Sequence, residues 1–130
     1  AAWRQLASLQ LPTIAAEQRE AAEHGDVTKR LLALADGRTI ESVSLPMGRE
    51  RRSLCVSTQV GCARACTFCE TGRLGLLRNL TAGEITAQVT LQCREQRPDS
   101  LVFMGMGEPL DNLPALLQAL AVLVDRSGFG

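Results

Sequence analysis

Three closely spaced cysteines are the residues of this sequence best suited to chemistry. Cys62, Cys66 and Cys69 have the spacing C-x3-C-x2-C and follow a segment with strand character. Three thiolates can bind three irons of a 4Fe-4S cluster, whereas a cluster that only carries electrons needs four. The fourth iron is then open, and in this spacing it can bind the amino and carboxylate groups of S-adenosylmethionine (SAM). The spacing therefore predicts a radical SAM site, where an electron from the cluster cleaves SAM to a 5'-deoxyadenosyl radical.

A structural zinc site is the alternative for the same cysteines. Zinc needs a fourth ligand, and the only histidine is His24, but Cys55 and Cys93 could also serve. The chain has five cysteines, three of them within eight residues, so a secreted disulfide framework is not expected. Cys93 lies within an expected helix, where we expect a structural role.

The charge of the chain is balanced overall but not locally. The 14 basic and 14 acidic residues give no net charge, so the whole-chain field favours neither nucleic acid nor a membrane. Between Arg49 and Arg78, however, six arginines stand against two glutamates, and this segment could attract phosphate. No apolar run approaches the roughly 20 residues that span a bilayer, and no secretory signal is evident, so we expect a cytoplasmic protein without a membrane partner.

The N-terminal part is expected to contain a helix and a hairpin. Thr13 can cap a helix over residues 14–23. Residues 29–34 and 38–45 are strand-compatible runs around an Asp-Gly turn at 36–37, a pattern typical of a β-hairpin.

Strands and helices alternate in the rest of the chain. The expected elements are a strand over 53–58, a helix from a capping box at 81–84 to about residue 95, a strand over 100–104, and a helix after Asn112 that ends before Gly128. This order implies parallel strands with right-handed crossovers, but a βα barrel needs six to eight such units and on the order of 200 residues. We therefore expect an α/β fold with a helix and hairpin region over 1–48 and the first βα units of a truncated barrel over 49–130.

Five short motifs together resemble one family. They are CVSTQVGC at 55–62, CTFC at 66–69, TG at 71–72, RNLTAGEI at 78–85 and GMGEP at 105–109. They resemble the dual-specificity ribosomal and transfer RNA adenine-C2 methyltransferases and their resistance relatives that methylate adenine C8. The resemblance covers about residues 41–130. It implies a partial (β/α)6 barrel with the cluster at its mouth, SAM as both methyl donor and radical source, and adenosine in structured RNA as substrate.

The resemblance also implies a cofactor site. Cys62, Cys66 and Cys69 match the cluster ligands, and Phe68, Gly107 and Glu108 match residues that bind SAM. A glycine would let the backbone approach the cofactor, and a carboxylate would pair with its ammonium group.

Two further residues match catalytic positions of the family. Cys55, seven residues before Cys62, matches the cysteine that resolves a covalent link between protein and RNA. Taken by itself, a cysteine at a strand end could equally be a small core residue. Glu41 resembles a glutamate that accepts a proton near the adenine, although its spacing to Cys55 is one residue longer than usual. A salt bridge from Glu41 to Arg30 or Arg38 is the alternative.

One departure from the family limits the prediction. Family members use a second cysteine, near their C-terminal end, that first receives the methyl group, and this chain lacks that region. We therefore interpret the chain as an N-terminal portion of a monomeric parent enzyme that takes electrons from a cytoplasmic donor and binds structured RNA.

Two other functions stay open from the sequence alone. A radical SAM enzyme with a different substrate would need neither Cys55 nor Glu41. A zinc-stabilised nucleic-acid-binding module would explain the local arginine excess. The aromatic content of 3% argues against the latter, since base stacking needs exposed aromatic rings.

Overall fold

The computed structural model describes residues 11–61 and 75–129. These residues form a five-stranded sheet, a separate pair of strands, two α-helices and one 3-10 turn. The elements are β1 (Thr13–Ala22), β2 (Gly25–Ala33), β3 (Thr39–Pro46), β4 (Arg52–Cys55), β5 (Gln59–Gly61), β6 (Leu76–Asn79), α3 (Ala82–Cys93), β7 (Ser100–Val102), η1 (Pro109–Asn112) and α4 (Leu113–Leu123). Within this part of the chain, no helix combines the length and apolar character needed to cross a membrane.

The main sheet joins the N-terminal hairpins to the first parallel strands. Its order is β1-β2-β3-β4-β7, with antiparallel pairing up to β4 and parallel pairing between β4 and β7. The chain passes through α3 between these two parallel strands, so the α/β class expected from the sequence is confirmed. The predicted domain boundary falls between β3 and β4, which pair in this one sheet.

The prediction of a helix over residues 14–23 is wrong. This segment is strand β1, which pairs along its length with β2 and places Glu17 opposite Arg30. Its alanines, glutamates and glutamine favour a helix, but helix propensity is a weak preference that strand pairing can override. The expected hairpin at 29–45 is confirmed as β2 and β3.

The C-terminal elements largely agree with those predicted from the sequence. The capping box of α3 is present, because the Thr81 hydroxyl accepts from the Glu84 amide and the Glu84 carboxylate accepts from the Thr81 amide. Strand β4 ends at Cys55 rather than at residue 58, and β7 ends at Val102 rather than at residue 104. The pair of β5 with β6 was not expected.

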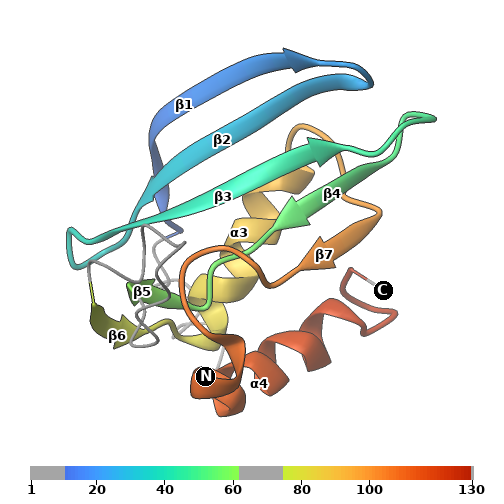
Figure 1. Cartoon of the computed structure of the whole chain (residues 1–130). Coiled ribbons are helices and arrows are strands. Elements are labelled where there is room, and N and C mark those ends of the chain that lie inside the picture. The colour runs from blue at the N-terminus through green and yellow to red at the C-terminus, as the bar shows by residue number, and fades with distance from the viewer. Residues whose placement is uncertain (1–10, 62–74, 130) are drawn as a thin grey trace.

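The helices cover one face of the sheet. Figure 1 shows α3 behind the sheet and α4 beside β7. The buried core joins strand and helix side chains: Leu32, Ile40, Leu54, Ile85, Val89, Ala119 and Leu123. Strand alternation then places Leu31, Glu41, Val43 and Cys55 together on the opposite face, where all four are half-buried.

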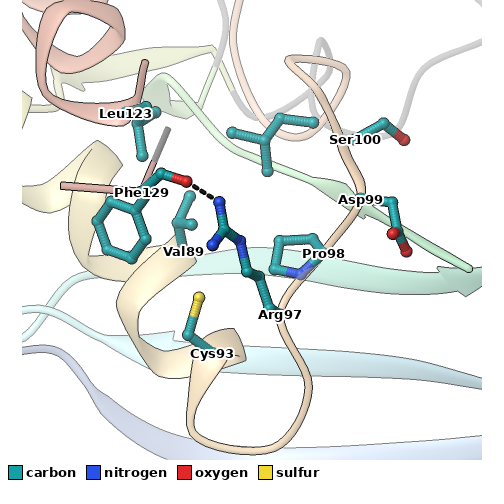
Figure 2. Close-up of a pocket in the computed structure, with 9 residues that line it drawn as sticks. Val89, Cys93, Arg97, Pro98, Asp99, Ser100, Leu123 and Phe129 are labelled. Carbon is teal, nitrogen blue, oxygen red and sulfur yellow. Dashed lines mark hydrogen bonds between the residues drawn. The ribbon is translucent and has the colours of Figure 1, made fainter. Parts of the chain in front are cut away.

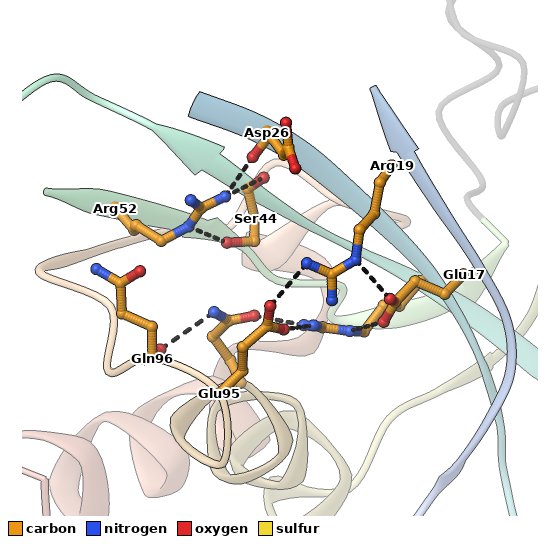
Figure 3. Close-up of polar contacts among 9 residues, drawn as sticks. Glu17, Arg19, Asp26, Ser44, Arg52, Glu95 and Gln96 are labelled. Carbon is orange, nitrogen blue, oxygen red and sulfur yellow. Dashed lines mark hydrogen bonds and ion pairs between the residues drawn. The ribbon is translucent and has the colours of Figure 1, made fainter. Parts of the chain in front are cut away.

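A buried arginine holds the first hairpin onto α3. The Arg30 side chain on β2 is only 5% exposed, and it donates to Glu17 on β1, to Gln92 on α3 and to Glu95 just after α3. Arg19 adds ion pairs to both Glu17 and Glu95, and Figure 3 shows these three side chains converging. A buried cation is stable only when it is paired in this way.

Removing this cation should destabilise the fold. Arg30→Ala leaves the buried Gln92 oxygen without its donor and leaves Glu17 and Glu95 paired with Arg19 alone, and we expect a loss of about 2 kcal/mol in the free energy of unfolding. Arg38→Ala is the matched control, because Arg38 is exposed and lies 3.9 Å from Asp36; it should cost no more than about 0.5 kcal/mol. Equal losses in urea denaturation would contradict this role of Arg30.

The same network should make stability depend on pH. Hydrogen bonds from Arg30 and then Arg19 hold the pKa of Glu17 below its ordinary value of 4.5. A hydrogen bond from Arg19 lowers the pKa of Glu95. Burial opposes this shift, and Arg30 adds to it. A carboxyl group whose pKa is lower in the folded state stabilises the fold above its unfolded pKa, and this contribution is lost as the pH falls.

We therefore expect the free energy of unfolding to decrease from about pH 5 downward. The double variant Glu17→Gln/Glu95→Gln should show a shallower decrease, whereas Glu20→Gln on the same strand should keep the wild-type slope. An unchanged slope in the double variant would assign the acid sensitivity to other groups.

Candidate functional site

Three consecutive polar residues lie buried at the point where β4 leaves the main sheet. Ser57, Thr58 and Gln59 are each at most 1% exposed. Buried polar groups are stable only when they form hydrogen bonds, so the partners of these residues determine what is held around them. The Thr58 hydroxyl has no partner among the described residues, but the Thr58 and Gln59 amides both donate to the Met106 carbonyl.

The Ser57 hydroxyl links two distant segments. It donates to the backbone carbonyl of Glu41 on β3 at 2.6 Å and accepts from the amide of Met106 at 2.8 Å. Gln88 of α3 fixes the Ser57 backbone from the helix side, because its carboxamide accepts from the Ser57 amide at 2.9 Å and donates to the Ser57 carbonyl at 2.8 Å. Ser57 therefore sits in a hydrogen-bonded position between helix, strand and turn.

Gln59 makes the corresponding links toward Glu108. Its side-chain oxygen accepts from the Glu108 amide at 2.9 Å, and its side-chain nitrogen donates to Asn79 Oδ1 at 2.7 Å. Asn112 completes the set, since its side chain donates to the carbonyls of Thr58 and Leu80. The sequence predicts that Asn112 caps the following helix, but its side chain forms no such cap.

The glycines of the GMGEP turn are needed for close packing. A Cβ at Gly105 would lie 2.6 Å from the Ser57 hydroxyl, and one at Gly107 would lie 2.5 Å from the Gln59 Cβ. Gly107 also has a φ of +100°, which disfavours other residues. In the structure these glycines let the turn pack against residues 57–59, which is a reason for glycine that the sequence did not indicate; the approach of the backbone to a ligand stays a prediction.

The strands on either side of the cysteine segment, residues 62–74, pair with each other, and we call this pair of β5 and β6 the neck. Strands β5 and β6 pair through Gln59 with Asn79, Val60 with Arg78 and Gly61 with Leu76. A Cβ at Gly61 would overlap the Gly75 carbonyl, so the two backbones are in contact. The predicted ligands Cys62, Cys66 and Cys69, together with Phe68, lie outside the described residues. Among the described residues, no cluster of three or more metal-ligating side chains is present.

Glu41 forms a salt bridge, although with a different partner from those considered. Its carboxylate lies 3.1 Å from Lys29 Nζ on β2, and both side chains are about half exposed. Arg30 is instead buried with Glu17 and Glu95, on the other face of the sheet. The sequence did not single out Lys29.

Cys55 shares a face with Glu41. It lies opposite Val43 on β3 and next to Val102 on β7, and it is half-buried and forms no disulfide. Burial raises the pKa of the Cys55 thiol, and a hydrogen bond with the Met104 backbone partly opposes this. The structure thus brings Cys55 and Glu41 onto neighbouring strands, with Ser57 fixing the Glu41 backbone.

A separate pocket lies away from these residues. It has a volume of about 180 Å³ and is lined by residues of α3, β7 and the end of α4 (Figure 2). Arg97 there donates to the Phe129 carbonyl. Burial raises the pKa of the Cys93 thiol, while the charge of Arg97 opposes this. None of the predicted site residues lines this pocket.

The arrangement around Glu108 suits the methionine end of SAM. Among residues 11–61 and 75–129, the Leu110 amide is the only partner of the Glu108 carboxylate, at 3.2 Å, which leaves acceptor capacity for an ammonium group. Gln59, which holds the Glu108 amide, precedes Cys62 by three residues. Glu108 and strand β5, which precedes Cys62 in the sequence, are therefore in direct contact.

Comparison with known proteins identifies the family of the chain. Residues 56–129 match the Radical SAM superfamily. The dual-specificity RNA methyltransferase RlmN of Syntrophotalea carbinolica is 52% identical over 100 residues, which is 77% of this chain and 27% of that protein. A probable RNA methyltransferase of Sorangium cellulosum is 52% identical over 98% of this chain and 34% of its own length.

A solved structure agrees with the fold. The crystal structure of a radical SAM methyltransferase from Sphaerobacter thermophilus aligns with a TM-score of 0.82 and 38% identity, over 97% of this chain and 38% of that one. The chain thus spans about a third of the length of these relatives. The superfamily binds a 4Fe-4S cluster and SAM, and the resemblance stated from the motifs is confirmed. The chain belongs to the radical SAM superfamily, in which its relatives are RNA methyltransferases of the RlmN type.

Proposed function

We propose that this chain is the cofactor-binding part of an enzyme that methylates adenine in ribosomal RNA, with transfer RNA as a second substrate. The observation that carries the proposal is the convergence on residues 57–59 of Glu41, the GMGEP turn and the neck of the cysteine segment. Its relatives include proteins named dual-specificity RNA methyltransferases. In the parent protein we expect a partial (β/α)6 barrel, a division near residue 48, a monomer and a cytoplasmic electron donor.

The cofactor site is assigned to five residues and one aromatic contact. Cys62, Cys66 and Cys69 would hold the cluster, and Gly107, Glu108 and Phe68 would line the place of SAM. The bound cluster and SAM supply the radical that starts the reaction. The role of this chain would be to orient SAM. The Glu108 carboxylate would pair with the ammonium group of SAM, and the turn that carries Glu108 would hold that carboxylate in place.

Cys55 and Glu41 would complete the reaction on RNA. In this proposal RNA is first joined to a methylcysteine of the parent protein. The Cys55 thiolate then forms an S–S bond with that sulfur while the S–C bond to RNA breaks. The electron pair of the broken bond stays with the carbon, which takes a proton from solvent and becomes the methyl group. Glu41 takes the proton that leaves the adenine ring. Both residues lie on the face of the sheet opposite the helices, on neighbouring strands.

The first test concerns the metal. Anaerobic reconstitution of the chain should give a brown protein with about four irons, because three thiolates suffice to hold a cubane cluster. Alanine at any one of Cys62, Cys66 or Cys69 should abolish iron uptake, whereas the control Cys93→Ala should not. Binding of stoichiometric zinc without any iron would contradict the assignment of a 4Fe-4S cluster.

The second test concerns Cys55 and separates an RNA methyltransferase from a radical SAM enzyme with another substrate. In a protein extended to the full length of the relatives, Cys55→Ala should keep the cluster and SAM cleavage but fail to release product. A covalent protein–RNA adduct should then accumulate on denaturing gels, since no thiolate attacks the linking sulfur.

The wild-type protein provides a check on this chemistry. Because burial raises the pKa of the Cys55 thiol, release of RNA should become faster as the pH rises above neutral. If Cys55→Ala methylates RNA at the wild-type rate and traps no adduct, the proposed role of Cys55 is wrong and Cys55 is only a core residue.

A further inference from the structure

Gln59 connects the neck of the cysteine segment with the turn that carries Glu108. We infer that Gln59, held by Asn79, is a positioning residue that sets how the Glu108 carboxylate meets the ammonium group of SAM. This inference rests on the proposed function, because it gives Glu108 the role assigned to it there.

The orientation of the Gln59 side chain is fixed by chemistry. The Glu108 backbone amide can only donate, so the atom 2.9 Å from it must be the side-chain oxygen of Gln59. The side-chain nitrogen then faces Asn79 Oδ1, at 2.7 Å. Gln59 is fully buried, so its carboxamide depends on these two hydrogen bonds.

The turn has little freedom to move away from Gln59. The carbon chain of Gln59 fills the space where a Cβ of Gly107 would stand, and the Gln59 amide donates to the Met106 carbonyl. Glu108 itself is extended, and its carboxylate accepts from the Leu110 amide at the start of η1. The direction of the carboxylate therefore depends on a backbone that Gln59 holds from one side.

The two hydrogen bonds also join both strands of the neck to the turn. Gln59 lies on β5, just before the cysteine segment, and Asn79 lies on β6, just after it. A displacement of either strand would be transmitted to the Glu108 amide through Gln59. The buried Gln59 carboxamide thus ties the Glu108 backbone to both β5 and β6.

The experiment measures SAM binding by the full 130-residue chain after anaerobic reconstitution, using labelled SAM and equilibrium dialysis. Gln59→Met keeps the length of the side chain and removes both hydrogen bonds. The dissociation constant for SAM should rise about tenfold or more, with unchanged iron content. Gln59→Glu keeps an oxygen facing the Glu108 amide, and the Asn79 carboxamide can turn over to donate to the other oxygen, so this variant should bind SAM within about threefold of the wild type.

Gln92→Met is the matched control, because Gln92 is another buried glutamine with hydrogen bonds to Arg30 and Gln96 but none to the turn. It should lower the thermal unfolding midpoint without weakening SAM binding. A loss of affinity in Gln59→Met no larger than that in Gln92→Met overturns the inference.

If Gln59→Met does not fold, Asn79→Ala is the variant to measure, because Asn79 is exposed and its replacement leaves the core unchanged. It should weaken SAM binding about threefold or more, and wild-type affinity would overturn the inference. Iron-loaded wild-type chain that binds no SAM at all would instead overturn the proposed function, and the inference with it.

Discussion

The need to satisfy buried polar groups at residues 57–59 determines the arrangement of the candidate site. An unpaired buried amide or hydroxyl costs about 1–3 kcal/mol, so the partners of these residues are strongly constrained. Those partners include the Glu41 carbonyl, the backbone of Met106, the Glu108 amide and the side chains of Asn79, Gln88 and Asn112. Parts of the site that are far apart in sequence are thus held by hydrogen bonds to three adjacent residues.

Helix α3 is the common support of the site and of the N-terminal hairpin. Its two buried glutamines, Gln88 and Gln92, are one helical turn apart on the face toward the sheet. Gln88 holds the Ser57 backbone, whereas Gln92 accepts from the buried Arg30. Movement of the hairpin relative to the site is therefore opposed by one helix, and the sheet from β1 to β7 adds backbone pairing to the same connection.

Local patterns predicted much of the fold, but not the contacts that residues 57–59 make with distant segments. The Asp-Gly turn and the capping box each have a local physical cause, and both are present. Strand β1 was missed because its helical composition is overridden by pairing with β2 and by Arg30. The partners of Ser57 and Gln59 come from segments up to 49 residues away. The only signal for them is a run of polar residues directly after a buried strand.

Amide hydrogen exchange would test the central claim most directly. The backbone amides of Ser57, Met106 and Glu108 donate to the side chains of Gln88, Ser57 and Gln59 respectively, within one buried network. The account predicts that all three exchange slowly and are released together as denaturant is added. Fast exchange at Met106 and Glu108, with Ser57 still protected, would show that the GMGEP turn moves independently of the strand end and would contradict the account.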